Sequence, residues 1–205
     1  MDKDKFRIDK LFPTPLYLCI LNNKISTDQL AKTPIKKNIR NHTSATADIL
    51  KDYPELKKEI EEHLNNYLQQ IHSPASSDLR LYITESWLNF TKKGEEHHTH
   101  YHPNSFVSGV FYISVNEETD NIEFVNGKQP AMYIQPKEDD SQLEKWHRTS
   151  SDCLVGVKNQ LLLLFPSTLE HLVPPVKGDQ PRISLSFNTF FKGQVSNLNQ
   201  VYLNL

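Results

Sequence analysis

Short runs of alternating apolar and polar residues fill the chain from residue 79 onward and constrain its fold more than any other feature. Seven runs are separated by clusters of Gly, Pro, Asn and Asp, at residues 79–91, 106–115, 121–125, 131–135, 152–157, 161–165 and 182–191. A period of two is typical of strands that bury one face. Because no helical pattern separates the runs, consecutive strands can pair antiparallel. The sequence therefore predicts a double-stranded β-helix, or jelly roll.

The segment before these runs has the period of a helix. Over residues 53–71, apolar side chains recur at steps of three and four, at Leu56, Ile60, Leu64, Tyr67, Leu68 and Ile71. Asp52 followed by Glu55 predicts a capping box at its start, and Pro54 suits a first turn. One apolar stripe predicts a helix that packs on the outside of the sheet.

The N-terminal third predicts fewer elements. Residues 11–21 predict a strand, and Pro13 and Pro15 confine it to a sheet edge or themselves to the strand's first residues. Residues 22–48 are a polar connection with a short helix that starts near residue 26. The expected organisation is mainly β with flanking helices. Residues 1–78 form a strand and helical support on a jelly-roll core of residues 79–205, within one globular domain.

Composition narrows the classes of partner and the compartment. With 23 basic and 25 acidic residues, the chain has no charge excess suited to nucleic acid or a membrane surface. Cys19 and Cys153 form no disulfide framework, which favours a reducing compartment, the cytoplasm. The charged N-terminus and the short apolar runs predict neither a signal peptide nor a membrane span.

The run HHTHYHP, residues 97–103, holds four of the nine histidines. If it is extended, His98, His100 and His102 share one face, opposite to His97. Histidines two residues apart lie about 6–7 Å apart along a strand, so their imidazoles can converge on one metal ion. A solvent-exposed histidine patch without function is the alternative interpretation.

His171 and Arg182 favour a functional interpretation of the histidine run. His171 follows the apolar run LLLLFP, where a lone histidine is more often part of the core. In RISLSFN, alternation places Arg182, Ser184, Ser186 and Asn188 on one face. An inward arginine is costly unless it meets an anion, and its planar fork suits a carboxylate. A structural Asp or Glu partner is the alternative.

ESWLNFTKKGEEHHTHYHPNSFVSGVFYI (85–113) with LLLLFPSTLEHLVPPVKGDQPRISLSFN (161–188) resembles a group of 2-oxoglutarate/Fe(II)-dependent oxygenases from bacteria and phages, in the prolyl-hydroxylase-like jelly-roll superfamily. The resemblance implies that His100 and His171 bind Fe(II). It also implies that Arg182 and Ser184 hold the distal carboxylate of 2-oxoglutarate.

The chain departs from the superfamily at the middle ligand. Most members have Asp or Glu two residues after the first histidine, where this chain has His102. Either His102 binds the metal, or a carboxylate such as Glu96 or Glu123 does, or metal binding is weak or absent. The first is favoured here, because the strand that follows matches the resembling group.

Asn89 and Tyr112 are further candidates for binding 2-oxoglutarate, since each can reach it from a neighbouring strand. The loop at residues 137–150, which includes His147, is a candidate lid over the site.

The resemblance implies an enzyme that uses O₂ and couples decarboxylation of 2-oxoglutarate to oxidation of a small-molecule or peptide substrate, with hydroxylation as the expected outcome. Two alternatives stay open. One is a cupin-like enzyme with three histidines that does not use 2-oxoglutarate, and the other is a noncatalytic jelly-roll module.

Overall fold

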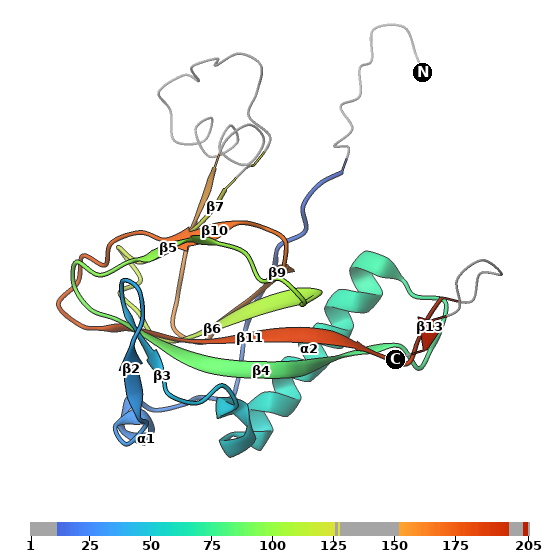
Figure 1. Ribbon diagram of the computed structural model, residues 1–205, viewed down its shortest axis with the longest axis horizontal. Coiled ribbons are helices and arrows are strands. Elements are labelled where there is room, and N and C mark those ends of the chain that lie inside the picture. Colours follow the sequence, from blue (N-terminus) through green and yellow to red (C-terminus); the bar gives the residue numbers. More distant parts are fainter. Residues whose placement is uncertain (1–11, 126, 128–151, 197–202, 205) are drawn as a thin grey trace, which may run out of the picture.

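The computed structural model describes residues 12–125, 127, 152–196 and 203–204, and these residues form three layers (Figure 1). The long helix α2 (Pro54–His72) lies beneath a seven-stranded sheet, and a four-stranded sheet lies on the other side of that sheet. Every pairing between neighbouring strands of these two sheets is antiparallel. The prediction of a mainly β chain with flanking helices is confirmed.

The large sheet contains strands from both ends of the chain, and it has the order β1-β9-β6-β11-β4-β3-β2. Its strands are β1 (Tyr17–Ile20), β2 (Ile35–Lys37), β3 (His42–Ser44), β4 (Arg80–Thr91), β6 (Val107–Ser114), β9 (Leu161–Pro166) and β11 (Arg182–Lys192). The predicted strand in residues 11–21 is thus at a sheet edge, where Pro13 and Pro15 precede its first paired residue. The β2–β3 hairpin lies at the opposite edge.

The small sheet has the order β5-β10-β7-β8. Its strands are β5 (His97–His100), β7 (Asn121–Phe124), β8 (Cys153–Gly156) and β10 (His171–Val173). A separate two-stranded sheet pairs β12 (Gln194–Ser196) with β13 (Leu203–Asn204). Strands β2, β3, β5 and β10 are not among the predicted strands, because their three or four residues show no clear alternation of apolar and polar side chains. The strand predicted at 131–135 and the loop at 137–150 lie outside the described residues.

Both helices lie where the sequence predicts them, but the N-terminus of α2 differs from the prediction. The 3₁₀-helix η1 (Ile49–Asp52) extends through Asp52, so Tyr53 becomes the N-cap of α2 and makes no side-chain capping bond. The predicted capping box of Asp52 and Glu55 is therefore wrong. The short helix α1 (Thr27–Leu30) has a capping box instead, between Ser26 and Gln29.

Two apolar cores lie on the two faces of the large sheet. The first lies between α2 and this sheet and includes Ile60, Leu64, Leu185 and Phe187, whereas Ile71 is 46% exposed and does not belong to it. The second core lies between the two sheets, around the fully buried Phe165. The large sheet therefore has an apolar core on each of its two faces.

A β-bulge in β4 decides which residues face this gap. Glu85 pairs with Asn188 of β11 and Ile83 pairs with Thr189, so Thr84 is an extra residue without a partner in the ladder. The β4 side chains that pack on the helix side are Leu81 and Ile83 before the bulge and Leu88 and Phe90 after it. Because the bulge shifts the alternation by one residue, the odd-numbered residues after it face the small sheet.

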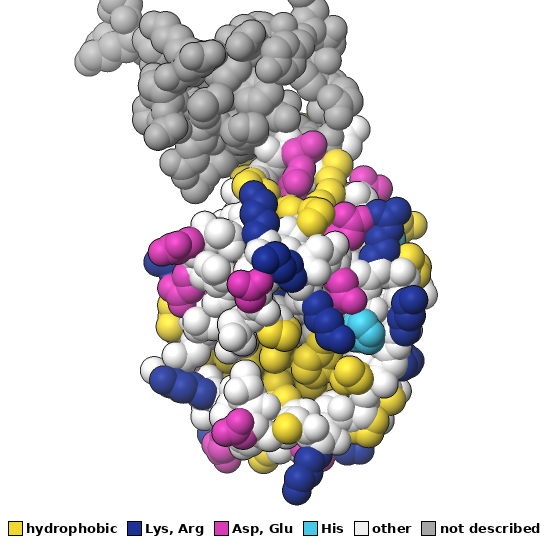
Figure 2. All heavy atoms as spheres, turned by 90° about the vertical axis from the view of Figure 1, so that its left-hand side faces the viewer, with side chains coloured by type: hydrophobic (Ala, Val, Ile, Leu, Met, Phe, Trp, Pro, Cys, Tyr) yellow, Lys and Arg dark blue, Asp and Glu magenta, His cyan; other side chains and the backbone are white. Residues whose placement is uncertain are grey.

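Figure 2 shows the side of the molecule that carries the β2–β3 hairpin. Hydrophobic side chains gather near its centre, and basic and acidic side chains are mixed around them. Neither sign of charge forms a continuous area there, so this face has no electrostatic feature suited to a phosphate backbone. Among the described residues, no helix is both long and apolar enough to cross a membrane.

Candidate active site

Three histidines gather between the two sheets. His100 ends β5, His171 begins β10, and the two are direct partners across that ladder. His102 lies two residues beyond β5 and completes the group. A ring nitrogen of each lies within 4.8 Å of the others. These three side chains could hold one metal ion, since metal–nitrogen bonds of about 2 Å fit such a spacing.

Local structure explains how His102 turns toward its partners. The His102 backbone N–H donates to the Ser167 carbonyl at 2.9 Å, which ties this segment to the end of β9. Pro103 cannot donate to a ladder, and Asn104 has a left-handed φ of 61°. The strand therefore ends before His102, and the turn carries its imidazole back over β10, with ring centroids of His102 and His171 at 5.3 Å.

The site keeps these imidazoles neutral. Burial, followed by neighbouring imidazoles, lowers the pKa of His171 to about 3 and that of His102 to about 4. Burial also lowers the pKa of His100. The Nδ1 atoms of His100 and His171 lie 2.8 and 3.0 Å from the carbonyls of His98 and Leu169. Donation from Nδ1 leaves each Nε2 with a free lone pair, which is the form that binds a metal.

The predicted alternation of the histidine run is not kept. The β5–β10 register pairs His100 with His171 but His97 with Val173, so three steps on β5 oppose two on β10. This irregularity brings the His97 ring to 4.3 Å from that of His100, closer than His98 at 5.5 Å. His97 therefore lies beside the cluster and not on the face opposite to His100.

Neither candidate carboxylate joins the cluster. Glu96 forms an ion pair with Arg40 of the β2–β3 hairpin. Glu123 alternates on β7 with the buried Ile122 and Phe124, which places its side chain on the other face of the small sheet. In the described part of the chain, the group around His100 consists of histidines alone.

Arg182 lies on the opposite wall of the gap, at the start of β11. It is 3% exposed, and its guanidinium lies 5.1 Å from the centre of the Tyr112 ring. No carboxylate of the described residues contacts it, and its Nε has no hydrogen-bond partner. The alternative of a structural Asp or Glu partner thus has no support among these residues. A buried guanidinium without a counter-charge requires an anion.

Other buried polar atoms face the same space. Ser184 is 2% exposed and pairs across the ladders with Tyr112 and Asn89. Asn89 donates through Nδ2 to Ser186 Oγ at 2.9 Å and keeps a free Oδ1. The Tyr112 hydroxyl is buried beside the Arg182 guanidinium, and burial raises its pKa to about 12. These orphaned atoms fit a bound polar molecule, because buried polar groups are rarely left unpaired.

Two residues of this polar space were missed by sequence reasoning. Thr91 is the ladder partner of Arg182, is 1% exposed and has an unpaired hydroxyl. Asn41, next to β3, is 2% exposed and pairs neither atom of its amide. The position of Thr91 two residues after Asn89 was a usable signal, since alternation places both on one face. Nothing in the sequence pointed to Asn41.

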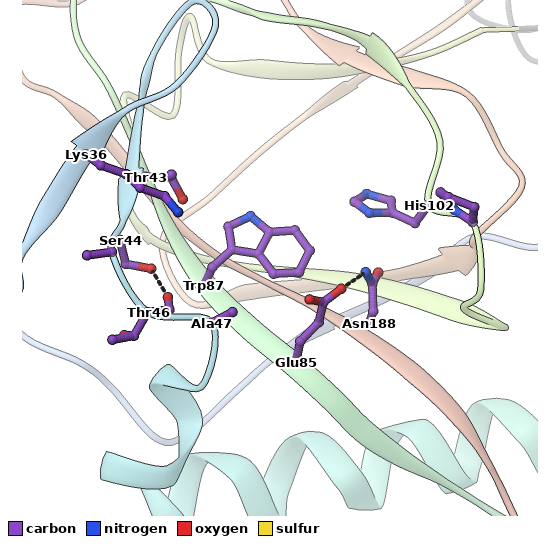
Figure 3. Close-up of a pocket in the computed structure, with 11 residues that line it drawn as sticks. Lys36, Thr43, Ser44, Thr46, Ala47, Glu85, Trp87, His102 and Asn188 are labelled. Carbon is purple, nitrogen blue, oxygen red and sulfur yellow. Dashed lines mark hydrogen bonds between the residues drawn. The ribbon is translucent and has the colours of Figure 1, made fainter.

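A cavity of about 400 Å³ opens beside His102. Its walls come from the β2–β3 hairpin and the segment after it, from β4 and β11, and from His102 and Pro103 (Figure 3). The indole of Trp87 lies across this space, with its ring centroid 5.8 Å from that of His102. A molecule in the cavity would therefore lie next to the histidine cluster.

Comparison with known families defines the class of protein. Residues 85–188 match the family described as "Putative 2OG-Fe(II) oxygenase". The match covers half of the chain and contains all three histidines and Arg182. The chain belongs to this family and is a 2-oxoglutarate/Fe(II)-dependent oxygenase, an enzyme that uses O₂ with iron and 2-oxoglutarate as its cofactors.

Solved structures agree with the jelly-roll prediction. An oxidoreductase of the 2OG-Fe(II) oxygenase family from Burkholderia pseudomallei is 11% identical, with a TM-score of 0.55 over 80% of this chain and 75% of that one. HygX from Streptomyces hygroscopicus, with nickel, 2-oxoglutarate and hygromycin B bound, is 13% identical, with a TM-score of 0.55 over 86% and 82%. The carbocyclase SnoK from nogalamycin biosynthesis is 12% identical, with a TM-score of 0.54 over 88% and 81%. No curated protein matches the sequence.

Proposed function

We propose that His100, His102 and His171 bind the ferrous ion and that Arg182 binds 2-oxoglutarate. The observation that supports this most strongly is the position of the unpaired guanidinium. Arg182 is buried on the large sheet, and the histidine cluster comes from the small sheet and the turn after it. A cosubstrate between the sheets can therefore present one end to the metal and the other to the arginine.

The proposed metal face is neutral. Three imidazoles carry no charge in the state that their lowered pKa values favour, whereas two histidines and a carboxylate would carry one negative charge. The ferrous site is thus one unit more positive than in the common arrangement. That extra charge weakens metal retention and strengthens the attraction of an anionic cosubstrate.

The proposed cosubstrate site uses the orphaned polar atoms. Arg182 and Ser184 bind the distal carboxylate, because a planar guanidinium and a hydroxyl two residues away can both donate to one carboxylate. The Tyr112 hydroxyl donates to the same end of the molecule. Asn89 and Thr91 line the adjacent wall, where a free Oδ1 and a free hydroxyl complete the polar space.

The chemistry that bound iron and 2-oxoglutarate supply is the activation of O₂, coupled to oxidative decarboxylation, for the oxidation of a second substrate. The chain contributes orientation and a site protected from water. We place the second substrate, a small molecule, in the cavity beside His102, with hydroxylation as the outcome. We place the enzyme in the cytoplasm, because its two cysteines lie far apart in the sequence and form no disulfide framework.

Anaerobic titration with Fe(II) and then 2-oxoglutarate tests this proposal. Direct chelation of the metal by 2-oxoglutarate gives a visible charge-transfer band, expected only when both are present. The band should be absent in His171→Ala, and in Arg182→Ala it should need a much higher 2-oxoglutarate concentration. Iron binding without a band would favour the cupin-like alternative. No iron binding would contradict the assignment of the three histidines.

A further inference from the structure

The cavity beside His102 contains one carboxylate that the fold holds in place. Glu85 directly follows the bulged residue Thr84, so it faces the gap between the sheets and not the helix. Thr84 fixes the bulge by donating its hydroxyl to the Asn188 carbonyl at 3.1 Å. Bulges next to active sites commonly redirect a side chain in this way.

A buried hydrogen-bonded chain then orients the carboxylate. Asn188 Nδ2 donates to Glu85 Oε1 at 2.7 Å, and Ser108 Oγ donates to Asn188 Oδ1 at 2.8 Å. Ser108 Oγ in turn lies 2.8 Å from Ser167 Oγ. Asn188, Ser108 and Ser167 are 6%, 2% and 0% exposed. Because a carboxylate only accepts, the amide must turn its nitrogen to Glu85, and Ser108 satisfies the amide oxygen that remains.

The rest of the cavity gives this carboxylate an aromatic neighbour and a cation at a distance. In Figure 3 the Trp87 indole lies between Glu85 and Asn188 at one end and Lys36 and Thr43 at the other. His102 is at the Glu85 end. No ion pair to Glu85 or Lys36 occurs within the described ranges. The two charges are therefore available to a ligand.

Most other polar groups of the cavity wall are already paired. The Thr43 hydroxyl donates to the Leu88 carbonyl at 2.8 Å, and the Ser44 hydroxyl donates to the Thr46 carbonyl at 2.7 Å. Ala45, Ala47 and Pro103 add apolar surface. Recognition of a ligand at the metal-proximal end therefore depends on the second oxygen of Glu85 and on the Trp87 ring.

We propose that this cavity binds the oxidised substrate through a positively charged nitrogen, held between the Trp87 ring and the Glu85 carboxylate. The substrate is thus a small amine whose cationic group lies next to the metal site. A tryptophan face is the best aromatic partner for a cation, and the oriented carboxylate supplies the counter-charge. Lys36 repels a cation at the far end, which fixes the direction in which the amine enters. This inference rests on the proposed function for the role of the ligand as substrate, but not for its binding.

Binding of three probes of equal length tests the proposal: butylammonium, butanol and butyrate. The full chain is loaded with Zn(II) and saturating 2-oxoglutarate, so that butyrate cannot occupy the space at Arg182. The readout is the indole N–H resonance of Trp87, which Trp87→Phe assigns because the chain has only two tryptophans. Butylammonium should shift this resonance with a dissociation constant about fivefold lower than that of butanol. Butyrate should bind less tightly than butanol.

Two variants of equal charge change provide the contrast. Glu85→Gln should lose about threefold of the butylammonium affinity and leave butanol unchanged. Glu62→Gln, on α2 beneath the other face of the large sheet, should behave as wild type. Equal or tighter binding of butanol or butyrate would overturn the proposal, as would a preference for the amine in Glu85→Gln as large as in wild type.

A repeat without Zn(II) and 2-oxoglutarate separates this inference from the proposed function. The residues that hold the amine come from β4 and β11 and do not include a proposed metal ligand. Preference for butylammonium should therefore persist in the protein alone. Its persistence, together with a missing charge-transfer band in the iron titration, would remove the proposed function and leave an amine-binding cavity.

Discussion

Replacement of Arg182 by Met should separate stability from cosubstrate binding. Arg182 is 3% exposed and has no acidic partner in the described residues. Methionine keeps the apolar stem that packs beside Tyr112 and removes the charge. We expect the variant to fold, to be at least as stable as wild type without cosubstrate, and to lose 2-oxoglutarate binding.

The magnitude follows from the burial of the guanidinium. A buried ion without a partner costs several kcal/mol, and the contact with the Tyr112 ring returns only about 0.5–2 kcal/mol. Replacing a buried ion pair by apolar residues of similar volume has been neutral or has raised stability by about 1–4 kcal/mol in other proteins. Without 2-oxoglutarate, we therefore expect Arg182→Met to raise the free energy of unfolding by about 1–4 kcal/mol.

Cosubstrate should stabilise wild type alone and so shift the difference between the two proteins in favour of wild type. At a 2-oxoglutarate concentration 100-fold above the dissociation constant, wild type gains about 2.7 kcal/mol, and the variant gains nothing. The measurement is urea unfolding of the Zn(II)-loaded protein with and without 2-oxoglutarate. Arg80→Met, at the exposed start of β4, controls for the loss of one positive charge and should keep the full gain. The reasoning is refuted if Arg182→Met loses more than about 2 kcal/mol without cosubstrate, or if it still gains stability when 2-oxoglutarate is added.

Three further outcomes follow from the packing and the histidines. A methyl group on Gly109 would lie 2.1 Å from Phe187 Cζ, so Gly109→Ala should cost about 1–3 kcal/mol in urea unfolding, whereas Gly156→Ala, with 3.8 Å to its nearest neighbour, should change little. The pKa of His171 is lowered to about 3 against about 6.5 when unfolded, so the unfolded state takes up protons first on acidification. As the pH decreases from 6.5, the free energy of unfolding of the metal-free protein should thus decrease, by up to about 1.4 kcal/mol per pH unit from this residue. Between pH 7 and pH 5, the urea midpoint of His171→Ala should decrease less than that of wild type. His102→Asp adds a negative charge to the metal face, so this variant should bind Fe(II) more tightly than wild type and much more tightly than His102→Ala. Competition with a chelator measures the three affinities. Equal affinities in all three proteins would contradict metal binding by residue 102.

Elements with a regular pattern of apolar residues were predictable from the sequence, and elements without one were not. The strands β4, β6, β9 and β11 and the helix α2 appear close to their expected bounds, because each buries a whole face or stripe. The strands β5 and β10 are four and three residues long and carry polar histidines, so no local period reveals them. They exist because each pairs with a neighbour across the small sheet.

The candidate site shows the same division. Motif order and spacing in the sequence were enough to predict four site residues, namely His100, His102, His171 and Arg182. The place of His97 could not, since the irregular register of β5 against β10 decides it. Asn41 became visible only through its buried and unpaired amide.

The sequence by itself determined the class of fold and predicted three histidines and an arginine as site residues, because alternation, apolar content and motif order are local properties of the chain. Only the tertiary structure decided which side chains meet. The bulge at Thr84 moved Glu85 and Trp87 to the face of the gap, and pairing between distant strands set Arg182 opposite the histidines. The physical reason is that register and bulges are fixed by contacts across the sheet, and those contacts join residues more than a hundred positions apart.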